Sequence, residues 1–253
     1  MEKIALITGA TSGIGEACAW SFAKAGYNII ITGRRKERLD VISRKLEDEA
    51  AVKVRSLCFD VRERNAVETA FGELETEWKN IDVLINNAGL ALGRESFDEA
   101  DIDDWEIMLS TNVNGILYVS RSILPEMIKK GSGHIFNIGS IAGKEVYEKG
   151  NVYCASKSAV DALTRSMRID LLKHGIKVTG IHPGAVETEF SLVRFHGDSG
   201  KAAETYKGYT PLTAEDVSEV VLYCASLPPH VCINDLVLTC TSQANAFYFN
   251  KMA

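Results

Sequence analysis

The sequence predicts an α/β fold: one doubly wound parallel sheet of about seven strands with helices on both faces. Short apolar runs alternate with longer helix-forming stretches along the chain, and a glycine-rich turn joins the first run to the first helix. Runs that are apolar throughout are typical of parallel strands, because right-handed crossover helices cover both faces of such a sheet.

The apolar runs predict strands over residues 3–7, 28–32, 53–58, 81–85, 133–138, 176–181 and 235–239. Helices are predicted between them, over residues 14–25, 36–49, 63–78, 103–130, 152–173 and 213–226. No linker-like composition and no internal repeat interrupts this alternation. Residues 1–253 are therefore predicted to form one domain.

Local signals refine these elements. Gly26 is placed to end the first helix with a left-handed residue, and Thr213 with Asp216 forms a capping sequence for the last helix. Pro125 lacks a backbone N–H and is expected to kink the helix over 103–130. The long, polar, glycine-containing stretch 186–211 is predicted to be a substrate loop that acts as a lid.

The glycine-rich turn is a predicted pyrophosphate site. Gly9, Gly13 and Gly15 lie between a buried strand and a helix. Glycine allows backbone to approach a bulky anion, and the start of the helix offers free N–H groups and a positive dipole end. The spacing differs from the G-x-G-x-x-G fingerprint, and a plain strand–helix connection is the alternative. The position favours dinucleotide binding.

The end of the second strand favours NADP over NAD. An NAD-binding fold usually places an acidic residue here to accept the ribose hydroxyls. This chain has Gly33-Arg34-Arg35 instead, and guanidinium groups suit a 2′-phosphate through bidentate hydrogen bonds. The alternative is that both arginines only begin a solvated helix.

Tyr153 and Lys157 lie one helical turn apart and follow Ser140. Residues at this spacing share a helix face, so a phenol and an ammonium can reach one cleft. A cation beside a phenol stabilises the phenolate, and we expect Lys157 to draw the pKa of Tyr153 towards neutrality. Such a tyrosine can transfer a proton to or from a substrate oxygen, which the Ser140 hydroxyl would also contact.

These features resemble the short-chain dehydrogenase/reductase family over nearly the whole chain, which implies a Rossmann fold. The matching segments are Thr8 to Gly15, Asp60-Val61, Asn86-Asn87-Ala88-Gly89, Asn112, Ser140, Tyr153, Lys157 and Pro183-Gly184. The resemblance implies a catalytic tetrad of Asn112, Ser140, Tyr153 and Lys157. It implies NADP contacts from Gly9, Thr11, Ser12, Gly13, Ile14, Gly15, Arg34, Arg35, Asp60, Val61, Asn87, Ala88, Gly89, Tyr153, Lys157, Pro183, Gly184, Val186 and Thr188.

A narrower resemblance lies in the substrate region. Residues 87–93, 189–195, 197–201 and 227–230 are similar to the NADP-dependent 3-hydroxy acid dehydrogenases, which oxidise serine and allo-threonine and reduce malonic semialdehyde. Ser140, Tyr153 and Arg194 are the candidate substrate-binding residues. Arg194 could pair with a substrate carboxylate, and a lid or subunit-contact salt bridge is the equal alternative.

Three other functions stay open. One is a reductase of the same family that acts on ketoacyl carriers or sugars. Another is a catalytically idle dinucleotide-binding protein, against which the complete tetrad argues. The last is a non-redox enzyme, such as an epimerase or dehydratase, that uses the same tyrosine.

Composition excludes several classes of protein. The net charge is −6 with dispersed Lys and Arg, so no nucleic-acid partner is expected. No apolar run approaches a membrane span, and the chain enters its first strand directly, so we expect a cytoplasmic protein. The six cysteines and five histidines form no ligand-spaced cluster, so no metal is expected. The family resemblance implies a homotetramer built on the helices near 103–130 and 152–173.

Overall fold

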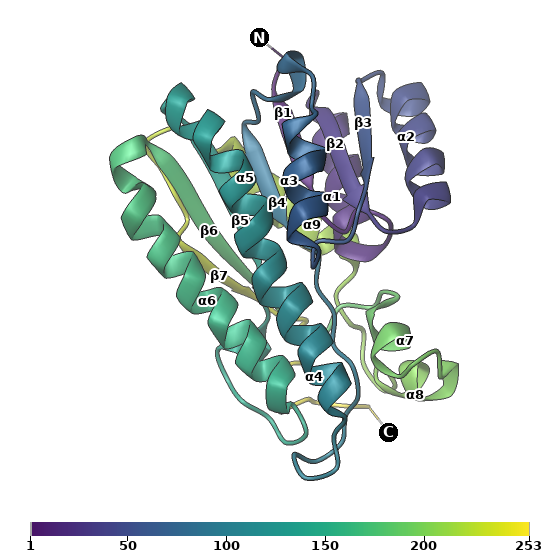
Figure 1. Cartoon of the computed structure of the whole chain (residues 1–253). Coiled ribbons are helices and arrows are strands. Elements are labelled where there is room, and N and C mark those ends of the chain that lie inside the picture. Colours follow the sequence, from purple (N-terminus) through teal and green to yellow (C-terminus); the bar gives the residue numbers. More distant parts are fainter. Residues whose placement is uncertain (1, 253) are drawn as a thin grey trace.

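The computed structural model describes residues 2–252. Within that range, seven strands form one parallel sheet in the order β3-β2-β1-β4-β5-β6-β7 (Figure 1). The strands are β1 (Ile4–Ile7), β2 (Asn28–Gly33), β3 (Val54–Cys58), β4 (Val83–Asn86), β5 (Gly133–Ile138), β6 (Ile176–Pro183) and β7 (Asp235–Leu238). The predicted doubly wound α/β fold is confirmed, because the strand order reverses direction at β1.

Helices cover both faces of the sheet. Those that carry the fold are α1 (Gly13–Lys24), α2 (Lys36–Ala50), α3 (Arg64–Gly72), α4 (Ile102–Leu109), α5 (Gly115–Lys130), α6 (Asn151–Leu171) and α9 (Ala214–Ser226). One face packs against α1, α2 and α9, and the other packs against α3, α5 and α6. Two short helices, α7 (Phe190–Arg194) and α8 (Ser199–Glu204), project beyond the sheet (Figure 1).

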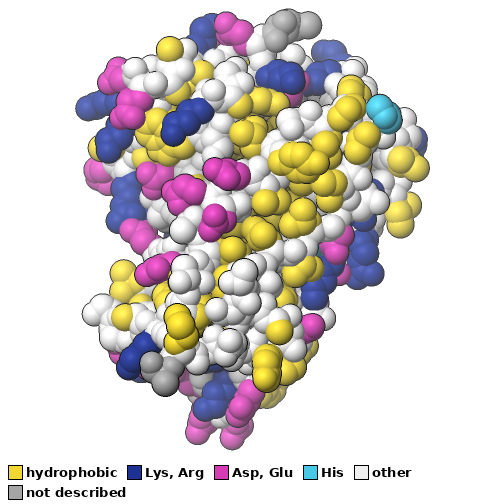
Figure 2. All heavy atoms as spheres, turned by 180° about the vertical axis from the view of Figure 1, so that it is seen from behind, with side chains coloured by type: hydrophobic (Ala, Val, Ile, Leu, Met, Phe, Trp, Pro, Cys, Tyr) yellow, Lys and Arg dark blue, Asp and Glu magenta, His cyan; other side chains and the backbone are white. Residues whose placement is uncertain are grey.

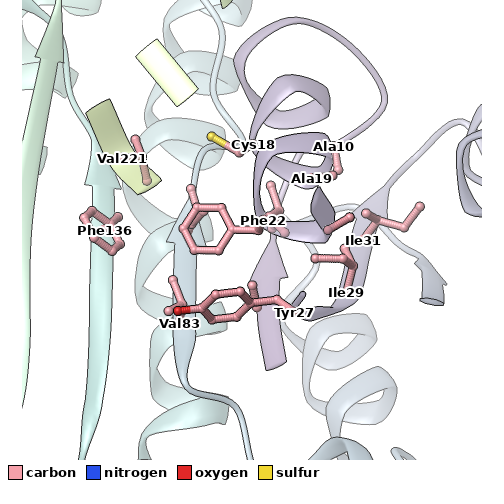
Figure 3. Packing of buried hydrophobic residues seen from close by; sticks show 14 of the residues in the cluster. Ala10, Cys18, Ala19, Phe22, Tyr27, Ile29, Ile31, Val83, Phe136 and Val221 are labelled. Carbon is pink, nitrogen blue, oxygen red and sulfur yellow. The ribbon is translucent and has the colours of Figure 1, made fainter. Parts of the chain in front are cut away.

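The first core layer is built from aromatic and branched side chains between α1, α9 and the sheet. Phe22 of α1 is fully buried and meets the Tyr27 ring edge-on, with ring centroids 5.1 Å apart. Figure 3 shows both rings beside Val83 of β4, with Phe136 of β5 and Val221 of α9 close by. Burial of such a side chain stabilises the fold by about 1.5–3 kcal/mol, which secures α1 and the turn before it.

Three predicted elements differ from the structure. The helix expected over 103–130 contains a π-helical turn, η2 (Ser110–Asn114), and α5 continues through Pro125 to Lys130. The helix expected over 63–78 ends at Gly72, followed by a 3₁₀ turn, η1 (Thr76–Trp78). The stretch 186–211 is no plain loop, because it contains α7 and α8. A β-bridge between Val186 and Leu212 joins the two ends of this stretch.

The predicted helix ends are confirmed. The Thr213 hydroxyl accepts from the Asp216 N–H, and the Asp216 carboxylate accepts from the Thr213 N–H, which completes a capping box. Gly26 follows α1 with a φ of 82°. Other residues rarely adopt this left-handed backbone, so glycine is needed at that position.

The rear face of the molecule carries acidic and basic side chains that are interspersed, and hydrophobic side chains gather in a band across it (Figure 2). No continuous basic surface is visible on this face. Among residues 2–252, none of the helices combines the length and apolar character that a bilayer crossing requires.

Acid should destabilise the fold through His134. This side chain is buried beneath Phe136, and burial lowers its pKa to about 3. The unfolded chain, with a histidine pKa near 6.5, therefore binds the proton better, and stability is lost as pH falls from about 6.5 towards 3. Lowering the pH from 7 to 5 should reduce the free energy of unfolding by about 2 kcal/mol through this group.

Urea unfolding at the two pH values checks this expectation. A His134→Gln variant should lose less stability on acidification than the native protein, by about 2 kcal/mol. The matched control is a His230→Gln variant, because His230 is exposed. This variant should lose as much stability on acidification as the native protein. Equal acid sensitivity in the native protein and the His134 variant would contradict the assignment.

Candidate active site

A cleft with a volume of about 310 Å³ lies at the carboxyl ends of the strands. Open α/β sheets bind ligands at this position. The glycine turn and the ends of β2, β4, β5 and β6 line the cleft, as do the start of α6 and the segment that leads into α7. Among the predicted site residues, the lining includes Gly9, Thr11, Ser12, Gly13, Ile14, Arg34, Arg35, Asp60, Val61, Asn87, Ala88, Gly89, Ser140, Tyr153, Lys157, Pro183, Gly184, Val186 and Thr188.

The glycine turn leaves no room for side chains. Gly9 and Gly13 have φ values of 65° and 55°, in the left-handed region. A Cβ at Gly15 would lie 2.4 Å from the Gly9 carbonyl oxygen, and one at Gly13 would lie 3.1 Å from Thr188. The turn therefore exposes bare backbone at the N-terminus of α1, and this cradle fits a dinucleotide pyrophosphate.

The segment after β4 braces the glycine turn. The Thr8 hydroxyl accepts hydrogen bonds from the backbone N–H groups of Asn87 and Ala88, each 3.0 Å long. In return, the Asn87 amide donates to the carbonyl oxygens of Thr8 and Gly9, at 2.9 and 3.2 Å. Asn87 and Ala88, two of the residues predicted to contact the coenzyme, thus help to fix the shape of the glycine turn.

Arg35 lies across the turn. Its guanidinium donates to the Thr11 and Ser12 hydroxyls at 2.7 and 2.9 Å, and to Glu189 at 2.8 Å. Glu189 also accepts from Arg38 at 2.7 Å, and these hydrogen bonds lower the pKa of its carboxyl group. The sequence alone did not single out Glu189, because its partner Arg35 is distant in the chain.

Arg34 is more open than Arg35. Its side chain is 58% exposed and lies 3.6 Å from Asp60. Burial raises the pKa of Asp60, but hydrogen bonds from Arg62 and the charge of Arg34 outweigh this and leave the pKa below its usual value. The ionised Asp60 thus anchors Arg62 and Arg34 beside the predicted phosphate position, and its neighbour Val61 lies against Gly115.

Ser140 and Tyr153 meet at the inner end of the cleft. Ser140 lies two residues after the end of β5, with extended backbone, and caps the turn η3 (Ile141–Gly143), where its hydroxyl accepts from the Ala142 N–H at 3.1 Å. Tyr153 lies in the first turn of α6 and is only 8% exposed. The Phe190 ring of α7 packs near the phenol, with ring centroids 5.8 Å apart.

The electrostatics of Tyr153 differ from the sequence expectation. Burial raises the pKa of Tyr153, and a hydrogen bond with Ser140 and the charge of Arg194 only partly oppose that rise. The Lys157 ammonium donates to the Ile138 carbonyl at 2.9 Å, and burial of the phenol has the larger effect on its pKa. The prediction that Lys157 draws this pKa towards neutrality is therefore wrong for this structure. The phenol is held in its neutral form.

Lys157 and Asn112 both lie close to Gly89. A Cβ at Gly89 would lie 3.1 Å from Asn112 Oδ1 and 3.5 Å from Lys157 Nζ. Burial lowers the pKa of Lys157 to about 8. The Asn112 amide exchanges two 2.8 Å hydrogen bonds with the Leu90 backbone and donates to Ser156 at 3.0 Å. The π-helical turn thus directs Asn112 towards α6.

The segment after β6 forms the opposite wall. Pro183 ends β6, and its carbonyl oxygen lies 3.5 Å from the Ser140 hydroxyl. The Gln243 amide oxygen accepts from the Ala185 N–H at 2.8 Å, and a Cβ at Gly184 would collide with it at 2.1 Å. Sequence analysis missed Gln243, since no motif marks a side chain that only supports backbone.

Arg194 of α7 does not line the cleft but lies beside Tyr153, which does. It donates to the Gly93 carbonyl and the Tyr147 hydroxyl, each at 3.1 Å. Its guanidinium carbon lies 5.5 Å from the centre of the Tyr153 ring. A positive charge from α7 therefore lies beside the phenol.

Known proteins agree with this architecture. A family model described as short chain dehydrogenase matches residues 3–197. NADP-dependent 3-hydroxy acid dehydrogenase YdfG of Escherichia coli (strain K12) is 47% identical over 96% of this chain and 97% of its own length. Sulfoacetaldehyde reductase 2 of Chromohalobacter salexigens is 44% identical, over 96% of each chain. The closed form of serine dehydrogenase complexed with NADP+ superposes with a TM-score of 0.92 at 45% identity, covering 99% of this chain and 100% of that one. The chain belongs to the short-chain dehydrogenase family.

Proposed function

We propose that this protein is an NADP-dependent oxidoreductase that transfers hydride between NADP(H) and a small 3-hydroxy acid of the serine, allo-threonine or 3-hydroxypropionate type. One observation carries the proposal: a single cleft places Ser140 and the neutral phenol of Tyr153 at one end and the exposed Arg34 at the other. The 47% identity to a 3-hydroxy acid dehydrogenase and the similarity to an NADP+-bound serine dehydrogenase support the substrate class and the coenzyme.

The chain's own residues would handle the proton. NADP(H), when bound, supplies or accepts the hydride. Tyr153 would donate the phenolic proton to a carbonyl oxygen in reduction, and in oxidation its phenolate form would accept the hydroxyl proton. Its raised pKa keeps the phenol protonated, as reduction requires. The Ser140 hydroxyl would orient the same substrate oxygen and stabilise the charge that develops on it.

Lys157 and Asn112 would support this chemistry. Lys157 would bind the ribose hydroxyls beside the nicotinamide, since its ammonium is buried at the cleft wall. Asn112 would hold a water that links Lys157 to solvent, and its position close to Lys157 beside Gly89 supports that role. Pro183, Gly184, Val186 and Thr188 would contact the nicotinamide.

The adenosine end would be held by the glycine turn and the arginines. Gly9, Thr11, Ser12, Gly13, Ile14 and Gly15 would hold the pyrophosphate, Arg34 and Arg35 the 2′-phosphate, and Asp60, Val61, Asn87, Ala88 and Gly89 the adenosine. The Arg35 guanidinium already contacts the Thr11 and Ser12 hydroxyls, so a phosphate bound there would meet guanidinium and hydroxyl donors together.

Arg194 would bind the substrate carboxylate. Replacing it with Ala should raise KM for serine about 10- to 100-fold, because hydrogen bonds to charged groups contribute about 1.5–3 kcal/mol. The measurement compares KM for malonic semialdehyde with KM for propanal, which has no carboxylate. If Arg194 binds the carboxylate, the variant raises KM for malonic semialdehyde and leaves KM for propanal unchanged. If Arg194 merely holds the lid through Gly93 and Tyr147, both values rise together.

A substrate panel tests the function. NADP reduction should be measured with D- and L-serine, allo-threonine, 3-hydroxypropionate and 3-hydroxyisobutyrate, and NADPH oxidation with malonic semialdehyde. Turnover with several of these acids supports the proposal. Silence across the panel, with turnover of a ketoacyl or sugar substrate, would instead make the protein another reductase of the family. Absence of turnover with every alcohol and carbonyl would indicate a dinucleotide-binding protein.

A second candidate substrate is sulfoacetaldehyde. It is favoured by the 44% identity to sulfoacetaldehyde reductase 2, and a sulfonate would pair with Arg194 as a carboxylate does. Adding sulfoacetaldehyde to the panel with NADPH separates the two. A higher kcat/KM for sulfoacetaldehyde than for malonic semialdehyde would reassign the substrate.

We further propose a cytoplasmic homotetramer. The six cysteines are free thiols, as expected in a reducing compartment. Large apolar side chains are exposed on α4 to α6 and just beyond: Ile102, Leu109, Leu117, Ile169 and Leu172. A contact between these helices in neighbouring subunits would cover them. A monomeric mass in light scattering at micromolar concentration would contradict this assembly.

A further inference from the structure

We propose that Lys144 is a positioning residue, which rests on the function proposed above. Its ammonium would hold the turn that carries Ser140 against the helix that carries Tyr153 and Lys157. Lys144 follows η3 directly, and Ser140 is the N-cap of that turn. The reacting oxygen must meet both hydroxyls at once, so their separation decides the rate.

The Lys144 ammonium joins three elements of the fold. It donates to Asp161 of α6 at 2.8 Å and to both carboxylate oxygens of Asp235, in β7, at 3.0 and 2.8 Å. Asp161 is buried and lies one helical turn after Lys157, on the face of α6 that also carries Tyr153. The turn after Ser140 is thus fastened directly to the helix that bears the proton-transferring phenol.

A second contact reaches Ser140 from the other side. His182 is fully buried, and its Nε2 lies 2.7 Å from the Asp235 carboxylate. A Cβ at Gly139 would lie 2.4 Å from Nδ1 of His182, so the ring lies directly against the backbone before Ser140. Lys144 therefore holds Asp235, and the His182 ring that packs on Gly139 lies beside the same carboxylate.

The charges explain why this lysine is needed. One carboxylate oxygen of Asp161, one of Asp235 and a ring nitrogen of His182 all lie within 4.8 Å of one another. Lys144 supplies the positive charge between the two carboxylates, with Arg165 adding a 3.1 Å contact to Asp161. Without the ammonium, the carboxylates repel, and α6 and β7 lose the link to the turn. The Gly143 backbone, which packs on the Lys157 carbonyl, would shift with it.

The test is a Lys144→Met variant. We expect kcat to fall about 10- to 100-fold, since small misplacements of reacting groups have effects of this size. KM for serine and Kd for NADPH, measured by fluorescence, should stay within about twofold, because Lys144 lines neither end of the cleft. Lys144→Arg should recover most of kcat, since a guanidinium can bridge both carboxylates. The control is Lys53→Met, an exposed ion pair with Glu2.

A double variant, Lys144→Met with Asp235→Asn, guards against simple misfolding, because it removes the repulsion between the carboxylates. A native unfolding temperature with a low kcat supports positioning. Native kcat in a folded Lys144→Met or double variant overturns the proposal, as does a crystal structure of either in which Ser140 keeps its place relative to Tyr153. If the native protein turns over no substrate, the proposed function fails, and that crystal structure still decides the role of Lys144.

Discussion

Replacing Tyr153 with Phe should reduce kcat by about 10²–10⁴-fold while NADPH still binds. The ring is buried beside Phe190, so Phe fills the same space and only the hydroxyl is lost. That hydroxyl is the proposed proton donor, and general acid–base catalysis contributes a factor of this size. Steady-state turnover with malonic semialdehyde, together with NADPH fluorescence titration, measures both quantities.

The control for this change is another tyrosine. Tyr223 is exposed, and Tyr223→Phe should leave kcat at the native value. Lost NADPH binding in Tyr153→Phe would mean that the ring, not the proton, was disturbed. Substantial remaining turnover would remove the proton-transfer role altogether.

Replacing Arg34 and Arg35 together with Ala should lower kcat/KM for NADPH about 10²–10⁴-fold. Each charge-assisted hydrogen bond to a phosphate contributes about 1.5–3 kcal/mol, and NADH lacks the 2′-phosphate. Steady-state kinetics with NADPH and with NADH give the ratio of the two kcat/KM values. Arg34→Ala should change the ratio through NADPH alone, whereas Arg35→Ala should also weaken NADH, because Arg35 holds Thr11 and Ser12.

The matched control is Arg55, an exposed arginine whose guanidinium pairs with Glu75 at 2.9 Å. Arg55→Ala should leave the coenzyme ratio unchanged. Equal catalytic efficiency of the native enzyme with NAD and NADP would refute the phosphate role of both arginines.

Local patterns were enough to predict most of the fold. The strands β1, β2 and β4 are largely apolar runs, and the ends of α1 and α9 carry their own glycine and capping signals. The errors fall where local propensity is uniform. Residues 103–130 form helix almost throughout, and the π-helical turn at Asn112 is specified by hydrogen bonds to Leu90 and Ser156 from other segments.

The candidate site divides in the same way. Glycine spacing and the order of motifs were enough to predict most of the residues that line the cleft, whereas the predicted Gly15, Asn112 and Arg194 lie outside its lining. The raised pKa of Tyr153 was not predictable from its spacing to Lys157, since burial dominates and Ser140 and Arg194 only partly oppose it.

The amino-acid order alone thus specified a parallel sheet with a dinucleotide cleft and the side chains that line it, since apolar runs, glycines and helix caps act over short range. Folding decided which of these groups are buried and paired. Arg35 meets Glu189 and Lys144 meets Asp235 only because the fold brings together residues from distant parts of the chain. Burial and ion pairing depend on that assembly, and they set the state of the phenol at the centre of the site.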